Sequence, residues 1–325
     1  MAYDGFEIDM LDIGEANCLL LSRWRNQDVQ RILIDGGRNA HSSYVKKFLK
    51  TKRIFRLNHV VCTHSDSDHC QGLIPLVMDP EFEIEQAWVH DPRRHADLDK
   101  AKVMLKEAVN GEYKSEAMYI QASLKDNLDL MEALADRKIL NEEPFTGATI
   151  GFLTVCGPSQ NYYQSLLNKF RDRRVLLQEL QKSASVTAAR KGKRELKDNP
   201  STTPENNSSV IMMTDSDLPR KFVFTGDAGV EALRLAASVY DLKNCHWMQI
   251  PHHGSVNNIN RELIQYFSAR TGFISADGSE HPDRAVVEAF KSVETRVYGT
   301  CGTGSLWHRV GAVPPRTGYS DAPEL

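Results

Sequence analysis

Several features that would place this chain in a membrane or outside the cell are missing from its sequence. None of its 325 residues belongs to a run approaching the roughly 20 apolar residues of a membrane span. No basic segment followed by an apolar stretch, which would indicate a secretory leader, opens the chain. Its 6 cysteines form no CxxC pair, and several lie inside apolar runs, as is typical of reduced core residues. We therefore expect a soluble cytoplasmic enzyme with no membrane contact.

An excess of charge of one sign is also absent. The chain has 40 Lys and Arg against 43 Asp and Glu, so its net charge is only -3. Any surface that binds a polyanion must then be local. Basic residues do gather between residues 159 and 205, where Tyr162, Tyr163 and Phe170 could stack on bases. A solvated helix face explains the same charges equally well, so both readings stay open.

What the chain does contain is a cluster of metal-binding side chains directly after an apolar run. Residues 60–63 predict the end of a buried strand, and His64, Asp66, Asp68 and His69 follow within six positions. Neutral imidazole and ionised carboxylate are the side chains that bind zinc, manganese or iron. A loop rich in Ser and Asp could hold two histidines by chance, so ligands from distant parts of the chain must decide.

Three further apolar runs end in residues of the same kind. The runs are 31–34, 221–225 and 247–250, and they lead into Asp35, into Asp227 and into the pair His252 and His253. Each fragment alone is common turn chemistry. Together they predict a dinuclear metal hydrolase in which Asp227 suits a bridging position and Asp35 orients a ligand. We favour His253 as the ligand of the pair, with His252 as a second contact, although either imidazole could point inward.

In sequence order, the segments LIDGG, THSDSDH, FTGDAG and PHHGS resemble the motifs of the metallo-β-lactamase fold superfamily. The usual HxHxDH motif reads HxDxDH here, because Asp66 stands at the second histidine position. This variant, together with residues 10–17, residues 274–278 and the pair His281 and Pro282, is similar to the hydrolase domain of ComEC-type competence proteins.

The resemblance covers about residues 6–90 and 206–305 and implies an α/β fold. The expected architecture is a metallo-β-lactamase-like αββα sandwich, in which two packed mixed β-sheets are flanked by helices. Residues 1–310 would form a single hydrolase domain with helical insertions at about 93–140 and 159–205. Residues 311–325 would form a surface tail.

For the site, the resemblance implies that His64 and Asp66 hold one ion. Asp68, His69 and one of the paired histidines would hold the other, and Asp227 would bridge the two.

A histidine that many family members place before the bridging aspartate has no clear counterpart here. Only His90 and His95 lie between residues 70 and 227, and their charged neighbourhood favours surface positions. The first metal site would then be weak, completed by substrate or completed by His281. An ordinary turn position before Pro282 is the alternative for His281.

Asp66 has a chemical consequence, since a carboxylate in place of an imidazole makes the site harder and more anionic. We expect two divalent ions, Zn2+ or Mn2+, with Mg2+ as a further candidate. Two such ions generate hydroxide near neutral pH and clamp the attacking and leaving oxygens. In this scheme Asp68 orients the nucleophile, and His281 stabilises charge or protonates the leaving group.

The leading hypothesis is a phosphodiesterase or nuclease acting on DNA or RNA. One alternative is a hydrolase of a small phosphodiester, a cyclic nucleotide or another ester or lactam. Another is a weakly active metal-binding subunit of a larger defence or uptake complex. A protein partner and a homo-oligomer both remain open.

Overall fold

The computed structural model describes residues 3–95, 114–167, 169–170, 194–218, 220–316 and 322–325. Two seven-stranded mixed sheets pack face to face in these ranges. The first sheet contains, in spatial order, β14 (Leu306–Ala312), β1 (Tyr3–Met10), β2 (Leu19–Asn26), β3 (Asp28–Ile34), β4 (Arg56–Val61), β5 (Glu83–Trp88) and β6 (Leu140–Glu142). The second contains β13 (Arg296–Gly299), β12 (Thr271–Ile274), β11 (Trp247–Gln249), β10 (Phe222–Phe224), β9 (Ile211–Thr214), β8 (Leu153–Gly157) and β7 (Thr149–Ile150).

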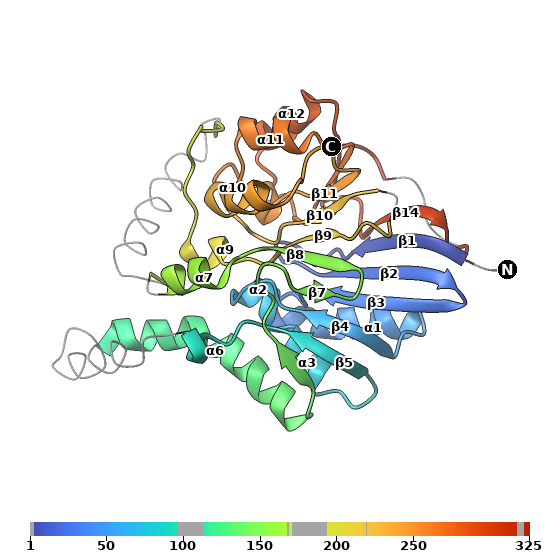
Figure 1. Ribbon diagram of the computed structural model, residues 1–325, viewed down its shortest axis with the longest axis vertical. Helices are drawn as coiled ribbons and strands as arrows, with labels where there is room; N and C mark the ends of the chain where they lie inside the picture. The colour runs from blue at the N-terminus through green and yellow to red at the C-terminus, as the bar shows by residue number, and fades with distance from the viewer. Residues whose placement is uncertain (1–2, 96–113, 168, 171–193, 219, 317–321) are drawn as a thin grey trace.

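Helices cover the outer face of each sheet (Figure 1). Those on the side of the first sheet are α1 (Ser42–Thr51), α3 (Leu73–Val77) and α6 (Lys114–Asp136), and those on the second are α10 (Val230–Val239), α11 (Arg261–Phe267) and α12 (Arg284–Lys291). The shorter elements are η1 (Asn39–His41), α2 (Ser67–Cys70), α4 (Pro92–His95), α7 (Gln160–Leu167), α9 (Pro204–Asn207) and η3 (His252–Gly254).

Apolar side chains form one core between the two sheets and one more on the outer face of each sheet. Phe6 and Ile8 of the first sheet meet Phe222 of the second in the layer between the sheets. Outside the first sheet the core includes Leu49 of α1, and outside the second it includes Leu233 of α10. Full burial of such side chains contributes about 1.5–3 kcal/mol each, so three filled layers hold the molecule together. The expected αββα sandwich is confirmed.

The two segments expected to be insertions contain helices, although residues 194–203 of the second form none. The first contains α4 and α6, and residues 96–113 between them lie outside the described ranges. The second begins with α7 and ends with α9. Most of its basic residues fall within 171–193, also outside the described ranges, so the predicted basic surface stays a prediction.

The last residues are held against the body of the protein more firmly than the expected surface tail over 311–325. A guanidinium nitrogen of Arg316 lies 2.7 Å from a carboxylate oxygen of Glu7, and Arg316 also pairs with buried Asp9. The backbone N–H of Leu325 donates to the carbonyl of Val297. The partners of Arg316 lie about 300 positions away in the sequence, so composition alone does not reveal these contacts.

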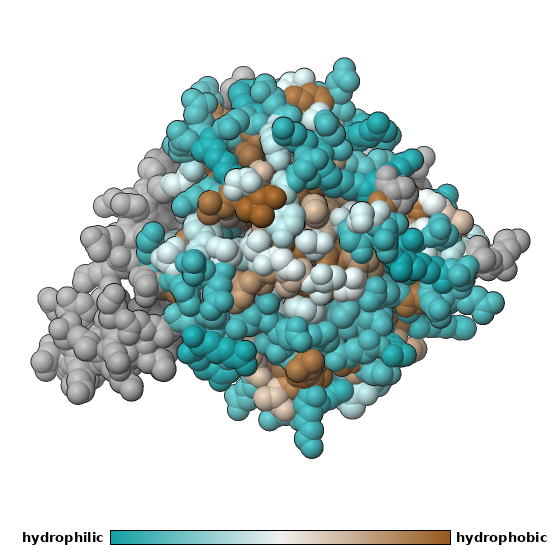
Figure 2. All heavy atoms as spheres, viewed as in Figure 1, coloured by the Kyte–Doolittle hydropathy of each residue, from teal (hydrophilic) through white to brown (hydrophobic). Residues whose placement is uncertain are grey.

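The outer surface is mainly hydrophilic on the face shown in Figure 2, apart from an apolar patch over α10. Leu235 and Val239 of this helix are exposed. Within the described ranges, no helix combines the length and apolarity needed to cross a membrane.

Candidate metal centre

The predicted site residues gather at one edge of the sandwich, where parallel strands of both sheets end. Strands β3 and β4 run parallel in the first sheet, and β10 and β11 run parallel in the second. Asp35 follows β3, the hexapeptide from His64 follows β4, Asp227 follows β10 and the paired histidines follow β11. The carboxyl ends of parallel strands are where sites form in layered α/β folds. The structure brings these four strand ends together, and the metal-binding role of their residues stays a prediction.

Two groups of three side chains lie close enough to hold an ion each. Their potential ligand atoms are all within 4.8 Å of one another, and the groups are His64, His69 and Asp227, and Asp68, His69 and His253. Nε2 of His69 lies 3.3 Å from a carboxylate oxygen of Asp227. Nε2 of His253 lies 3.5 Å from one of Asp68. His69 is therefore shared between the two groups.

The imidazoles of this centre are oriented as metal ligands usually are. In His64, His69 and His253 the Nε2 atom is buried and makes no well-formed hydrogen bond; each faces a carboxylate oxygen at 3.3–3.6 Å. Each Nδ1 atom, in contrast, has a partner: Thr63 and Ser209 hydroxyls for His64, Asp35 for His69 and the Ser275 carbonyl for His253. A ligating histidine typically donates its second ring N–H to such a group, which fixes the ring. These residues fit divalent metal ions.

Asp35 lies behind His69 and fixes its position. This fully buried carboxylate accepts hydrogen bonds from Nδ1 of His69 at 2.7 Å, from the backbone and hydroxyl of Thr63, and from the side chain of Asn17. Asn17 in turn accepts a bond from Gln249 at the end of β11. A continuous hydrogen-bonded chain thus runs from the second sheet to a candidate ligand of the first, as expected for an orienting residue.

The segment from His64 to His69, called the metal loop below, is also fixed by a close approach between two backbone segments. A Cβ atom added to Gly72, just after α2, would lie 1.9 Å from the carbonyl oxygen of Gly36. Only glycine fits there. The backbone N–H of Gly36 donates to the carbonyl of His69, which ties the loop after β3 to the candidate ligands.

Both paired histidines point into the centre. They have left-handed backbone angles, with φ of 47° at His252 and 54° at His253, which are uncommon for non-glycine residues. This turn directs Nε2 of His253 at Asp68, while Nε2 of His252 lies 3.7 Å from Asp227. Nδ1 of His252 is 2.7 Å from the side-chain oxygen of Asn258. His253 belongs to a ligand group and His252 lies beside the carboxylate expected to bridge.

Asp66 and His281 lie outside both groups of three. A carboxylate oxygen of Asp66 faces Nε2 of His64 at 3.6 Å, which is compatible with the expected shared ion. Nδ1 of His281 is instead 3.3 Å from Glu15, and its ring centre is 5.8 Å from that of His252. The structure thus places His281 beside the paired histidines and groups His64 with His69 and Asp227.

Charge pairing outweighs burial in the electrostatics of the centre. Burial opposes ionisation of Asp68, yet its hydrogen bond to His253 and the charge of His69 hold its pKa well below its ordinary value. Burial likewise opposes protonation of His69, but Asp227 and Asp35 raise its pKa well above the usual range. Protons and divalent ions therefore compete for the same imidazoles.

Three further residues near the centre were misplaced or missed by sequence reasoning. The expectation that His90 and His95 are surface residues is wrong: His90 is 4% exposed, and the side chain of His95 is buried against Glu143. Arg38, just after the DGG turn, places a guanidinium nitrogen 3.7 Å from Asp68 and is half exposed. In the sequence Arg38 is marked only by its position after the glycine turn, and this position does not distinguish it from other surface arginines.

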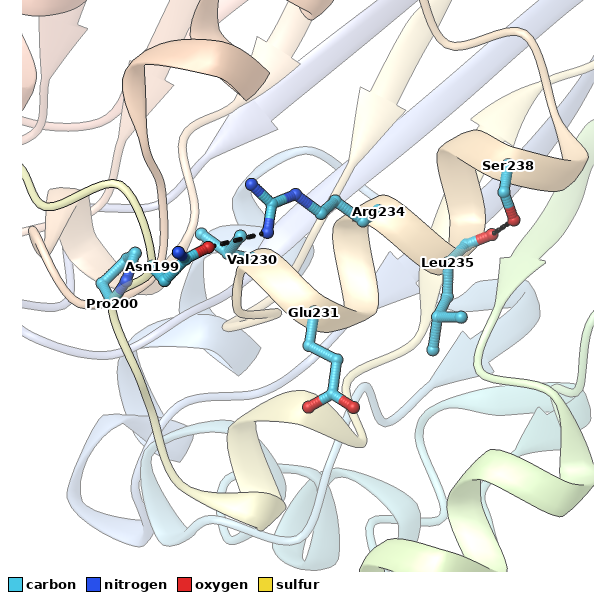
Figure 3. Close-up of a pocket in the computed structure, with 7 residues that line it drawn as sticks. All are labelled: Asn199, Pro200, Val230, Glu231, Arg234, Leu235 and Ser238. Carbon is cyan, nitrogen blue, oxygen red and sulfur yellow. Dashed lines mark hydrogen bonds between the residues drawn. The ribbon is translucent and has the colours of Figure 1, made fainter.

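A surface cavity of about 340 Å3 lies elsewhere, on the outer face of α10 (Figure 3). It is lined by Asn199, Pro200, Val230, Glu231, Arg234, Leu235 and Ser238. No candidate ligand lines it, so its location gives no support to the metal chemistry.

Comparisons with known proteins give distant likenesses. No family model matches the chain. ComE operon protein 3 of Bacillus subtilis (strain 168) is 26% identical over 113 residues, which are 34% of this chain and only 14% of that protein. A solved diphosphatase of the PhnP family has a TM-score of 0.45 at 7% identity, covering 95% of this chain and 98% of its own.

A Thermotoga maritima structure, described as a provisional metallo-β-lactamase, has a TM-score of 0.36 at 10% identity and covers 73% of this chain and 92% of its own. At these values neither structural likeness carries a function to this chain.

Proposed function

We propose that this protein is a metal-dependent hydrolase of phosphodiesters, acting on DNA or RNA. The observation that carries the proposal is the convergence of His64, His69, Asp227, Asp68 and His253, whose three buried Nε2 atoms and neighbouring carboxylates face one another. Two divalent ions bound there would lower the pKa of a water molecule and neutralise charge on phosphate oxygens. Zn2+ and Mn2+ both suit this mixed set of imidazoles and carboxylates.

The surroundings of the centre support a phosphodiester over a lactam. Asp66 adds an oxygen donor opposite His64, which favours the harder ions used on phosphates. Arg38 provides a half-exposed guanidinium at the rim, next to Asp68, where it could contact a phosphate oxygen in a bidentate manner. The ComEC-type HxDxDH motif supports the same substrate class.

Within this proposal the chain's own residues have distinct roles. His64, Asp66, Asp68, His69, Asp227 and His253 hold the ions, with His252 beside them. Asp68, whose side chain is 18% exposed, also orients the attacking water. His281 protonates the leaving oxygen. Asp35 holds His69 in its tautomer and orientation.

Cleavage assays on purified protein test the proposal. Supercoiled plasmid and labelled DNA and RNA oligonucleotides are incubated with Mn2+, Zn2+ or Mg2+. We expect cleavage by the wild type and a loss of at least about 100-fold in rate for Asp68→Ala. Asp217→Ala is the matched control, because Asp217 is an exposed carboxylate paired with Arg25, away from the centre.

The outcomes separate the alternatives. Wild-type protein that is inert on all nucleic acids but cleaves a cyclic nucleotide or bis(4-nitrophenyl) phosphate acts on small phosphodiesters. If wild type and Asp68→Ala are equally inert on every substrate and metal, the hydrolase proposal fails and a non-catalytic metal-binding subunit is left.

A further inference from the structure

A small cavity lies beside the metal loop, between that loop and the helices that follow β5. Its volume is about 10 Å3. Five parts of the chain line it: the loop after β4, the segment after β5, helix α6, the segment around α7 and the residue after α9. The lining residues are Cys62, His64, Ser65, His90, Leu124, Asn127, Tyr163, Phe170 and Ser208.

Apart from the candidate ligand His64, three side chains on this cavity bury polar atoms that have no hydrogen-bond partner. They are the hydroxyl of Ser65, Nε2 of His90 and the amide oxygen of Asn127. Each of these residues is less than one-tenth exposed, at 6%, 4% and 4% respectively. Most buried polar atoms in proteins have a partner, and water or an ion usually explains the exceptions. Three such atoms on one cavity point to a shared ligand.

The hydrogen-bonding capacity of these groups defines that ligand. The ring of His90 donates to the carbonyl of Pro144. Since Nε2 is the nitrogen without a partner, the donor is Nδ1, and Nε2 is left as an acceptor. Phe145 and Tyr163 contact the ring at centroid distances of 4.6 and 4.4 Å, which fixes its orientation. Burial lowers the pKa of His90 to about 3, so the ring is neutral near pH 7.

A single water molecule matches this arrangement in both number and size. It can donate one hydrogen to Nε2 of His90, donate the other to the amide oxygen of Asn127, and accept the hydroxyl hydrogen of Ser65. A cavity of roughly 10–15 Å3 holds one water. A phosphate group or a nucleobase is far too large for it. A metal ion is disfavoured because, among the described residues, His90 belongs to no group of three potential metal ligands.

We propose that this cavity binds one ordered water that joins Ser65 of the metal loop to His90 and to Asn127 of α6. Ser65 stands between His64 and Asp66. The water therefore holds the backbone from which both of these candidate ligands project. His90 and Asn127 are positioning residues that act through Ser65, so a histidine that is not a ligand still affects the metal site. This consequence for metal binding rests on the proposed function, whereas the water itself does not.

Crystallography at about 1.5 Å on the metal-free protein tests the water directly. We expect density for one water within hydrogen-bond distance of Ser65, His90 and Asn127. Asn127→Leu, which fills the cavity with an apolar side chain, should lack it. A dry cavity in the wild type, or density touching only one of the three side chains, would overturn the proposal.

Titration calorimetry with Mn2+ alone tests the positioning role. Ser65→Ala and Asn127→Leu should each weaken one of two Mn2+ sites by at least about 10-fold and leave the other unchanged. Thr271→Val is the control, since it removes another buried hydroxyl without a partner, at the opposite end of the second sheet. Ser65→Ala serves if Asn127→Leu fails to fold.

Unchanged affinity in Ser65→Ala, or an equal loss in Thr271→Val, refutes the positioning role. Wild-type protein that binds no Mn2+ contradicts the proposed function instead, and the crystal structure still decides the water.

Discussion

Replacing Asp35 by asparagine should lower both the unfolding free energy and the metal affinity without removing any member of the two candidate ligand groups. Asp35 does not belong to either group of three, yet it accepts a hydrogen bond from Nδ1 of His69 at 2.7 Å. The same oxygen accepts from Asn17 at 2.7 Å and from the hydroxyl of Thr63 at 2.8 Å. The other oxygen accepts from the backbone N–H of Thr63 at 2.7 Å.

An amide in place of this carboxylate cannot satisfy all four donors. If its NH2 group replaces the oxygen that accepts from the backbone N–H of Thr63, two donors face each other. If the amide is turned the other way, its NH2 group opposes the other three donors. Because Asp35 is fully buried, water cannot relieve either conflict. Loss of one charge-assisted bond and burial of an unpaired donor cost about 2–4 kcal/mol of unfolding free energy.

The effect on metal binding has a separate size. Loss of the partner that orients a ligating histidine typically weakens metal affinity 10- to 100-fold, or about 1.4–2.7 kcal/mol. Urea unfolding and Mn2+ calorimetry measure the two quantities on the same samples. The matched control is Asp9→Asn, a buried carboxylate on β1 whose partner is Arg316 rather than a candidate ligand.

Asp9→Asn should lose stability with unchanged Mn2+ affinity. If Asp35→Asn binds Mn2+ as tightly as the wild type, Asp35 does not position His69 for metal binding. The inference that the Nδ1 partner directs Nε2 of His69 at an ion is then refuted.

Three further changes test other parts of the structure. His253→Ala should lower the metal content from two ions to one by elemental analysis, whereas His252→Ala should retain both, and equal losses would contradict the grouping. Arg38→Ala should raise KM for a phosphodiester about 10-fold without changing metal content, and an unchanged KM would exclude a phosphate contact. Burial holds the pKa of His90 near 3, below the ordinary 6.5. Below pH 6.5 the unfolded state therefore binds a proton that the folded state does not. The contribution of neutral His90 to stability is complete above pH 6.5 and declines as pH falls toward 3. Between pH 7 and pH 5, wild type should lose about 2 kcal/mol more unfolding free energy than His90→Phe in urea titrations, and parallel curves would contradict a buried neutral imidazole.

The strand ends that carry the site could be predicted because the evidence for them is local, whereas the αββα layers were implied by the family resemblance. Apolar runs ending in Asp35, His64, Asp227 and His252 each predicted a strand end without reference to the others. Parallel pairing then brings such ends together whatever the exact register. Hydrophobic pattern and turn chemistry act over a few residues, which is why single-sequence reasoning could use them.

The pairing of ligands could not be predicted because it depends on where a short helix begins. The alternating HxDxDH pattern suggests successive pairs, but the chain turns into α2 at Ser67. His64 and Asp66 therefore project from the segment before the helix, while Asp68 and His69 project from a helical turn. Side-chain directions differ between these conformations, and the result is a group that joins His64 to His69.

The buried histidines after β5 show the same limit for contacts between distant residues. Arg93 and Arg94 are indeed exposed, so the segment reads as surface. Yet His95 turns inward to Glu143, 48 positions later, at 2.8 Å. The exposure of Arg93 and Arg94 does not predict the exposure of His95, which lies on the opposite side of the same short helix. The partner that buries His95 is Glu143, which is not adjacent in sequence.

Three of the nine non-glycine residues with positive φ in the described ranges lie at the metal centre, and their backbone cost favours a ligand there. Asp35, His252 and His253 all have positive φ, at about 1–3 kcal/mol each for sparsely populated backbone. The same site buries three imidazole nitrogens that face carboxylate oxygens at 3.3–3.6 Å without a well-formed hydrogen bond. Left-handed residues such as Asn26 occur at an ordinary hairpin turn, where solvent and turn geometry account for them. At the centre a bound cation would satisfy both the nitrogens and the carboxylates that the turns bring together, so the arrangement favours metal binding there.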